Sequence, residues 1–385
     1  MVTVGRQNDM KKRYCWGLWI LALFVGCSAP ELETIVVKET AVVEMPVTVE
    51  VKRLVEVTRQ VTIEAETAPP VVATAVPEYP VTTIKLVGAI AERSSEISGL
   101  AWYEDWLILL PQYPNFAGEP GDGFLYALRK DDILAYLNGD LDGLKALDIP
   151  IIAPGLADSI VGYEGFEALA FDGQRAYLTI EASPRQGMRG YLVTGEMAAD
   201  MSQLVLDTAV LTEILPQNDI GNKSEEALFV AGDKVVTLYE TYGAAVIESP
   251  VAHRFDANLA AVDAIPFPPI DYRVTDATAL DEDGRFWAIN YFFPGDTELA
   301  VDDEPLAARY GRGATHQQYE YVERLVQFQY SDDGITLTDT PPIQLELIAL
   351  DARNWEGVVR LDDQGFLLAT DKFPTTLLGF VSLDE

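Results

Sequence analysis

Acidic residues recur at one place in a pattern that this 385-residue sequence repeats five times. In each copy an acid is followed by a small residue and Leu or Val, then by a turn and an apolar segment. The acid lies two or four positions before the aliphatic residue, and because side chains alternate along a strand, the two share one face. Carboxylates gathered in this way repel one another unless some are protonated or bound to a cation. The five acids are Glu96, Glu167, Glu226, Asp276 and Glu356.

Calcium is the cation that this set of residues favours. Oxygen ligands at flexible spacing suit Ca²⁺, whereas Mg²⁺ demands a tighter octahedral geometry. The apolar segment of four copies ends in a polar residue that is expected to return to the same mouth of the domain. The alternative is that the acids are solvated or cap turns, as is common in a chain with 61 acidic and 27 basic residues. The four polar residues are Glu181, Glu240, Asn290 and Asp371.

Composition excludes several other chemistries. The two cysteines, Cys15 and Cys27, lie near the N-terminus, so the rest of the sequence offers no disulfide, thiolate zinc site or cysteine nucleophile. His253 and His316 are the only histidines, and neither lies in a repeat. The formal net charge of −34 repels a phosphodiester backbone, which excludes nucleic acid as a partner. The chemistry expected is therefore that of carboxylates.

The first 26 residues are expected to form a signal peptide. Three basic residues at 11–13 precede an apolar run over 16–26, which is too short to span a bilayer and is typical of an export signal. The stretch LFVGC, residues 23–27, resembles a bacterial lipobox, and this resemblance implies a diacylglyceryl group on Cys27. An ordinary cleaved signal or a membrane anchor is the alternative. The resemblance implies an exported lipoprotein, anchored in the membrane on the extracytoplasmic or cell surface.

Replacing Cys27 with Ser is expected to release the protein from the membrane fraction, because a serine hydroxyl cannot form the thioether that carries the lipid. The measurement is sedimentation with membranes after a high-salt wash. A Cys27→Ser variant that still sediments with membranes would contradict lipid anchoring at this residue.

Residues 27–81 differ in composition from the rest of the sequence. Valine alternates with Thr, Glu, Lys or Arg, and a proline-rich segment follows. Alternation with a period of two usually indicates a strand, but this stretch has no second apolar set on which to pack. We therefore expect an extended stalk, and the alternative is one long edge strand of the folded domain.

The repeats over residues 82–385 predict an all-β domain. Most copies contain a turn dipeptide with glycine, such as Asp283-Gly284, which supplies the positive φ of a tight hairpin turn. Further strand-like segments follow each hairpin, which makes four strands per copy and favours a β-propeller. Five blades are predicted, and six stay open because the interval after Asn290 is long. Residues 83–92 are expected to supply the missing strand of the last blade and to close the ring at the two ends of the domain.

Motifs within the repeats are similar to those of a known family. The motifs SGLAW, GFEALAF, SEEALFV, DEDGRFWAIN and NWEGVV span most of residues 83–385. They resemble the phytase-like esterase propellers of bacteria and, more distantly, the gluconolactonase, regucalcin and paraoxonase propellers. The resemblance implies acidic residues at the channel mouth and hydrolysis of a phosphoester or a carboxylic ester. It carries over Glu167, Glu226 and Glu356 as the matching acids, and it carries over no histidine dyad.

Two functions are consistent with these residues. In the first, the protein is a calcium-dependent ester or phosphoester hydrolase, in which Ca²⁺ polarises the substrate and one carboxylate activates water. In the second, it is a non-catalytic propeller with a structural metal that binds a ligand or a partner. We expect a monomer that acts on a small molecule and meets the membrane only through Cys27. An anionic substrate would need metal ions to bridge it to the carboxylates, since the basic residues near the acids are few: Lys223, Arg353 and Lys372.

Overall fold

The computed structural model describes residues 38–39, 57–58, 76–118, 120–349 and 352–383. The chain forms two compact units, which divide between Val72 and Ala73. In the first unit, β1 (Lys38–Glu39) pairs in antiparallel fashion with β2 (Val57–Thr58). The predicted signal peptide, Cys27 and the rest of the stalk before residue 76 lie outside the described residues. No helix within the described ranges is long and apolar enough to cross a membrane.

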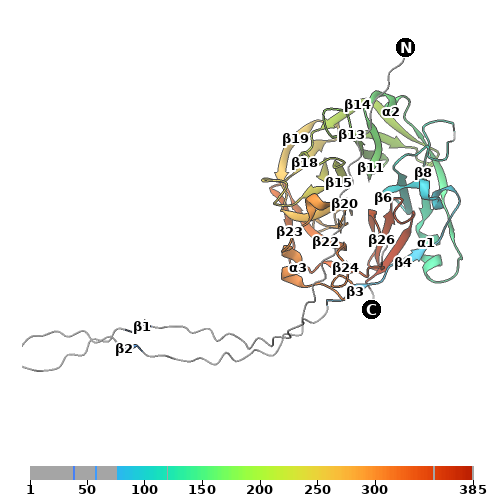
Figure 1. Ribbon diagram of the computed structural model, residues 1–385. Coiled ribbons are helices and arrows are strands. Elements are labelled where there is room, and N and C mark those ends of the chain that lie inside the picture. The colour runs from blue at the N-terminus through green and yellow to red at the C-terminus, as the bar shows by residue number, and fades with distance from the viewer. Residues whose placement is uncertain (1–37, 40–56, 59–75, 119, 350–351, 384–385) are drawn as a thin grey trace, which may run out of the picture. The chain divides into compact units, whose positions relative to one another are not determined.

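The second unit consists mainly of strands, and these pair in antiparallel groups of about four (Figure 1). Five such groups follow one another along the described residues. Group 1 comprises β6 (Ile97–Tyr103), β7 (Trp106–Pro111), β8 (Phe124–Arg129) and β10 (Leu147–Ile152). Group 2 comprises β11 (Tyr163–Asp172), β12 (Arg175–Ala182), β13 (Arg189–Met197) and β14 (Leu204–Ile214). Group 3 comprises β15 (Glu225–Ala231), β16 (Lys234–Tyr239), β18 (Val251–Asp256) and β19 (Ala261–Pro266).

Groups 4 and 5 complete the second unit. In group 4 two short strands pair with the same neighbour, β22, whereas group 5 takes its fourth strand from the start of the domain. Group 4 comprises β20 (Ile270–Ala277), β21 (Arg285–Phe292), β22 (Val322–Ser331), β23 (Gly334–Leu337) and β24 (Ile343–Leu345). Group 5 comprises β25 (Trp355–Leu361), β26 (Gly365–Thr370), β27 (Leu378–Ser382) and β4 (Thr82–Ile84). The short elements outside the groups include β9 (Leu144–Lys145), β17 (Thr241–Tyr242), α1 (Lys130–Leu137), α2 (Leu156–Ser159), α3 (Pro305–Tyr310) and the 3₁₀ helix η3 (Thr297–Leu299).

The first strands of the five groups form a closed ring. β6 contacts β11, β11 contacts β15, β15 contacts β20, β20 contacts β25, and β25 contacts β6 again. Groups 1 and 2 are also joined through their last strands, by parallel pairing of β10 with β14. The unit is therefore all-β with a propeller-type arrangement, in which the order of the groups around the axis follows the chain (Figure 1).

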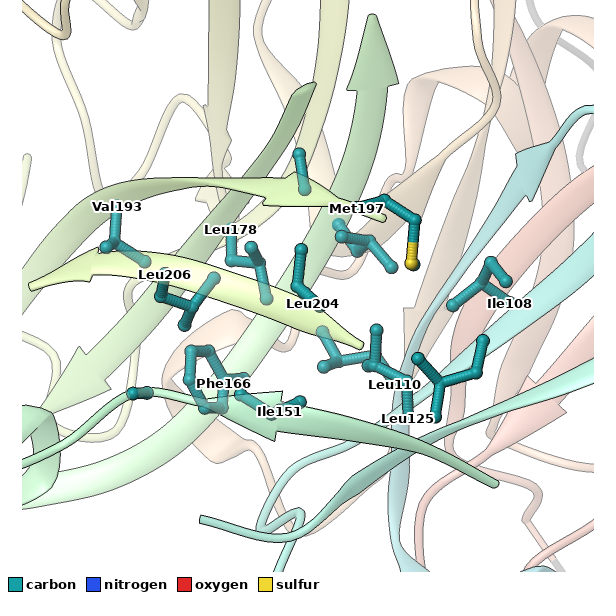
Figure 2. Packing of buried hydrophobic residues seen from close by; sticks show 14 of the residues in the cluster. Ile108, Leu110, Leu125, Ile151, Phe166, Leu178, Val193, Met197, Leu204 and Leu206 are labelled. Carbon is teal, nitrogen blue, oxygen red and sulfur yellow. The ribbon is translucent and has the colours of Figure 1, made fainter. Parts of the chain in front are cut away.

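Apolar clusters fill the space between every two neighbouring groups. The cluster between groups 1 and 2 contains Ile108, Leu110, Phe166 and Leu178, all of them buried (Figure 2). Corresponding clusters join groups 2 and 3, 3 and 4, 4 and 5, and 5 and 1. Because each group buries both faces of its sheet, inner strands such as β7 are nearly continuous apolar runs rather than alternating ones.

The two ends of the domain pair, as the sequence predicts. β4 lies antiparallel to β27, with Ile84 opposite Leu378, and thereby completes group 5. The strand is shorter than the predicted residues 83–92, because Gly88 has a φ of 100° and the chain then forms two 3₁₀ helices. The segments that follow β4 are β5 (Leu86–Val87), which pairs with β9, and the helices η1 (Ala89–Ala91) and η2 (Arg93–Ser95).

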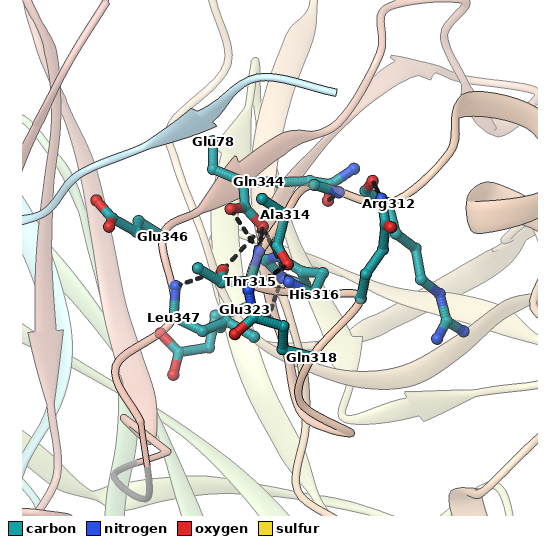
Figure 3. A network of polar contacts seen from close by, with 12 residues as sticks. Glu78, Arg312, Ala314, Thr315, His316, Gln318, Glu323, Gln344, Glu346 and Leu347 are labelled. Carbon is teal, nitrogen blue, oxygen red and sulfur yellow. Dashed lines mark hydrogen bonds and ion pairs between the residues drawn. The ribbon is translucent and has the colours of Figure 1, made fainter. Parts of the chain in front are cut away.

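The folded unit begins before residue 82, which corrects the predicted end of the stalk at residue 81. β3 (Glu78–Tyr79) pairs in parallel with β24. The Glu78 carboxylate accepts hydrogen bonds from the backbone N–H groups of Thr315 and His316 and lies 2.7 Å from His316 Nδ1 (Figure 3). Burial alone would raise the pKa of Glu78, but these hydrogen bonds outweigh it and lower the pKa. His316 thus anchors the segment that leads into β4.

Candidate functional site

The predicted acids lie at irregularities of the innermost strands. In each group the register between the first and second strands shifts, twice in group 2 and once in each of the others, and a β-bulge of this kind re-aims a side chain. Glu226 and Glu356 occupy the extra position of their strands, and Glu167 and Asp276 lie within the corresponding irregular stretches. In group 1 the extra residue is Ser98, two positions after the predicted Glu96.

A cavity of about 580 Å³ brings together five of the nine predicted site residues. Three come from bulges in β11, β15 and β25, and two from the ends of the second strands of groups 2 and 5. These five are Glu167, Glu226, Glu356, Glu181 and Asp371. The other lining residues are Gln112, Tyr113, Glu164, Asn222, Arg273, Tyr291, Phe293, Asp296, Ala352, Asn354, Lys372, Phe373 and Pro374.

Glu96 and Asn290 do not line the cavity, which corrects their predicted places in the carboxylate cluster. Glu96 precedes β6 with a left-handed φ of 39°, and its carboxylate lies 2.7 Å from Lys372 Nζ. Asn290 Oδ1 accepts a hydrogen bond from Arg324 Nε at 2.8 Å, and its amide donates to the backbone oxygen of Arg273 at 3.1 Å. Glu96 is therefore held by a lysine at the rim, and Asn290 braces neighbouring strands.

Asp276 lies at its bulge but also outside the cavity, contrary to prediction. Its carboxylate accepts hydrogen bonds from the backbone N–H groups of Val358 at 2.7 Å and Ala277 at 2.8 Å, which ties group 4 to group 5. Ser98 has the same use in group 1, where its hydroxyl donates to the backbone oxygen of Phe166 in group 2 at 2.7 Å. Two bulges therefore join neighbouring groups, and the other three present carboxyls to the cavity.

Arg273 supplies positive charge among the acids, and the sequence analysis missed it. Its guanidinium contacts Glu240 and lies 3.0 Å from Asn354 Oδ1 and 3.3 Å from Glu356 Oε1. Glu240, a predicted site residue, is fully buried behind the cavity lining and also lies 3.4 Å from Lys223 Nζ. Arg273 thus occupies the place among the carboxylates where the sequence predicts a metal cation.

Burial raises the pKa of the cavity carboxyls. Together with neighbouring carboxylates it raises the pKa of Glu181 to about 7 and that of Glu356 to about 8. The same two causes raise the pKa values of Glu167 and Glu226 well above the usual value. At neutral pH the cluster therefore holds protons as well as negative charge.

Glu356 and Asp371 form a pair of neighbouring carboxyls in different environments. The Asn354 side-chain amide donates to Glu356 Oε1. The backbone oxygen of Asn354 accepts a hydrogen bond of 3.2 Å from the backbone N–H of Asp371. Burial raises the pKa of Asp371, but its Oδ1 accepts a hydrogen bond of 2.6 Å from the backbone N–H of Phe373, which opposes that rise. Glu356 therefore keeps its proton at higher pH than its usual range allows, and the pKa of Asp371 is also raised, although its hydrogen bonds offset part of the rise.

Oxygen atoms of the type that Ca²⁺ prefers are present, although the described residues contain no group of three or more His, Cys, Asp or Glu placed to hold a metal ion. Glu181 Oε1 and Glu240 Oε2 are buried and have no hydrogen-bond partner among the described residues. Such atoms would accept a cation or a donor. Calcium therefore stays a prediction from the sequence.

Comparison with known proteins finds no matching family model and no matching curated protein. Solved structures with a similar course of the chain include a glucose dehydrogenase (13% identity, TM-score 0.42, 79% of this chain and 99% of that chain). Another is the GH43 endo-arabinanase from Bacillus licheniformis (12% identity, TM-score 0.41, 77% of this chain and 96% of that chain). A third is a luciferin-regenerating enzyme (11% identity, TM-score 0.40, 78% of this chain and 95% of that chain). Similarity this low carries no argument about activity, and the resemblance to phytase-like esterases stays a prediction.

Proposed function

We propose that the protein is a hydrolase whose catalytic centre is the Glu356–Asp371 pair. The observation that carries this proposal is the pair itself: two neighbouring carboxyls in one cavity, of which Glu356 has its pKa raised to about 8. Paired carboxyls of which one keeps its proton and the other is ionised can act as general acid and general base at neutral pH. The bond proposed is a carboxylic ester, and a phosphoester is the alternative.

Hydrolysis of an ester would use three side chains of the cavity. Asp371 takes a proton from water as the water oxygen bonds to the carbonyl carbon, and the carbonyl oxygen becomes negative. The Arg273 guanidinium, 3.3 Å from Glu356, stabilises that charge. Glu356 gives its proton to the leaving oxygen as the C–O bond breaks, which produces a carboxylic acid and an alcohol. Return of a proton from Asp371 to Glu356 through solvent restores the starting state.

The same proposal includes a fold and a location. We infer that the five groups are the five blades of a propeller, because their first strands contact one another in cyclic order and apolar clusters fill all five boundaries. Anchoring at Cys27 would place the domain outside the cytoplasmic membrane at the end of a stalk that ends before residue 76.

Ester hydrolysis is tested with purified full-length protein on p-nitrophenyl acetate, p-nitrophenyl butyrate, p-nitrophenyl phosphate and phytate, each with calcium and with a chelator. We expect turnover of the carboxylic esters above the buffer rate, because acid and base are both present at neutral pH. Loss of turnover in chelator, restored by calcium, would support the calcium prediction. Folded protein that turns over none of the substrates would contradict the hydrolase and favour a binding propeller.

A further inference from the structure

We propose that the cavity binds an organic cation, an ammonium group carried on an apolar body, so that the substrate is a cationic ester rather than a phosphate ester. The proposal rests on the proposed function for the ester bond, whereas cation binding stands on the charge, the burial and the aromatic surface of the cavity. The burial and the aromatic surface are independent of the catalytic pair, and five of the seven carboxyls that make up the charge lie outside that pair.

The charge of the cavity favours a cationic ligand over an anionic one. Its described lining contains seven carboxyl side chains and two basic ones, Arg273 and Lys372. Both basic groups are already engaged, Arg273 with Glu240 and Glu356 and Lys372 with Glu96. An anionic ligand would therefore meet a surplus of carboxyls, whereas a cation would reduce their repulsion. The formal charge of −34 on the whole chain also raises the local concentration of cations.

A buried carboxylate oxygen in the lining lacks a partner. Glu181 is 3% exposed, and its Oε1 has no hydrogen-bond partner among the described residues. A buried polar atom of this kind is costly unless a donor or a cation satisfies it. Glu181 lines the cavity, so a ligand that enters there can supply the missing positive charge.

Aromatic rings form the apolar part of the lining. Phe293 is 48% exposed and Phe373 is 50% exposed, which is unusual for large apolar side chains in a folded domain. Aromatic faces attract ammonium and guanidinium groups, and this cavity already uses them in that way. The guanidinium carbon of Arg273 lies 5.4 Å from the ring centre of Tyr291, and Lys372 Nζ lies 5.9 Å from that of Phe373. An inorganic ion gains little from such rings, whereas an ammonium group on an apolar body gains from both rings and carboxylates.

Binding of phenyltrimethylammonium to the full chain is measured by calorimetry and by thermal unfolding. Sodium at equal ionic strength, calcium and phenyl phosphate are the ligands with which it is compared. We expect phenyltrimethylammonium to bind and to raise Tm more than sodium does. Phe293→Ala and Phe373→Ala should each weaken its binding about 2- to 30-fold, since a ring contact with a cation is worth about 0.5–2 kcal/mol. Calcium binding, if present, should not change in these variants. Leu215→Ala, at a residue 62% exposed and outside the cavity, is the matched control and should have no effect.

Three outcomes would overturn the inference: phenyltrimethylammonium that binds no better than sodium, tighter binding of phenyl phosphate, or full affinity in both phenylalanine variants. Failure of the hydrolase is a separate result. Binding of the cation without turnover of an acetate ester of a quaternary amino alcohol supports the cation site and contradicts the hydrolase, and with it the ester substrate. Turnover of p-nitrophenyl acetate without cation binding contradicts the inference alone.

Discussion

Replacing Arg273 with methionine is expected to lower the free energy of unfolding by about 3–5 kcal/mol, because it leaves buried carboxylates without their counter-charge. Arg273 contacts Glu240, which is fully buried, and also reaches Glu356 and Asn354. Lys223 Nζ lies 3.4 Å from Glu240 Oε1. Among the described residues, this lysine is the one ion-pair partner that Glu240 would keep in the variant. The measurement is urea unfolding of the full chain at pH 9, where Glu356, with a pKa of about 8, is mostly ionised.

Two further variants make this prediction specific. Arg309 forms an exposed ion pair with Asp339, and Arg309→Met should cost less than about 1 kcal/mol. Adding Glu240→Gln to Arg273→Met should recover part of the lost stability, because it removes the carboxylate that has lost its partner. A loss below 1 kcal/mol in Arg273→Met, or no recovery in the double variant, would show that Arg273 does not compensate the cluster.

The all-β class was predictable from the sequence because it depends on short-range patterns, and the pairing of the domain's two ends was predictable because the last repeat lacks a strand. Glycine turns such as Gly173 and Gly284 have φ values of 57° and 77°, as tight hairpins require. The start of the domain was less predictable. β3 is two residues long, and the Glu78 bonds to Thr315 and His316 join residues more than 230 positions apart, which no local pattern reveals.

The candidate site was predicted only in part, since the argument from side-chain alternation does not hold at a bulge. Glu226 and Glu356 occupy bulges, so their direction is set by the break in register and not by their distance from Val or Leu. Glu96 was included because an offset of four keeps the same parity, but the residue in the equivalent place is Ser98. The shared parity therefore identified residues at the bulges of four groups, three of which line the cavity, and it chose the wrong residue in the first group.

A signal for Arg273 was nevertheless present in the sequence. Lys223, Arg273 and Arg353 each lie three residues before the acid of their own repeat, which are Glu226, Asp276 and Glu356. The first two contact Glu240, and Arg353 lies 2.8 Å from buried Glu323. Comparison of whole repeats, rather than of the acids alone, would have found a basic residue in the same register. It would also have weakened the case for a metal as the main counter-charge.

Replacing Glu356 with glutamine is expected to lower kcat/KM for ester hydrolysis by about 10²- to 10⁴-fold, because the amide cannot donate a proton to the leaving oxygen. In the wild type, kcat/KM should fall as pH rises above about 8, where Glu356 loses its proton. The variant should lack this decline in its residual rate. Asp371→Asn should lose activity to a similar extent through loss of the base, whereas Asp302→Asn, at an exposed acid outside the cavity, is the control and should retain full activity.

The same Glu356→Gln variant is expected to be more stable than the wild type at pH 9, so loss of activity could not be attributed to unfolding. The pKa of Glu356 is raised to about 8 in the folded state against 4.5 in the unfolded chain, so the folded protein binds the extra proton between these values. Stability from this group is therefore lost as pH rises from about 4.5 to 8, on the order of a few kcal/mol, and glutamine carries no such penalty. Because Glu356 also contacts Arg273, part of that gain will be offset.

Urea unfolding at pH 5 and pH 9 measures the difference between the two proteins. A variant that is less stable than the wild type at pH 9, and equally affected at pH 5, would mean that Glu356 serves mainly as a partner of Arg273, and the assignment of Glu356 as the general acid would then fail.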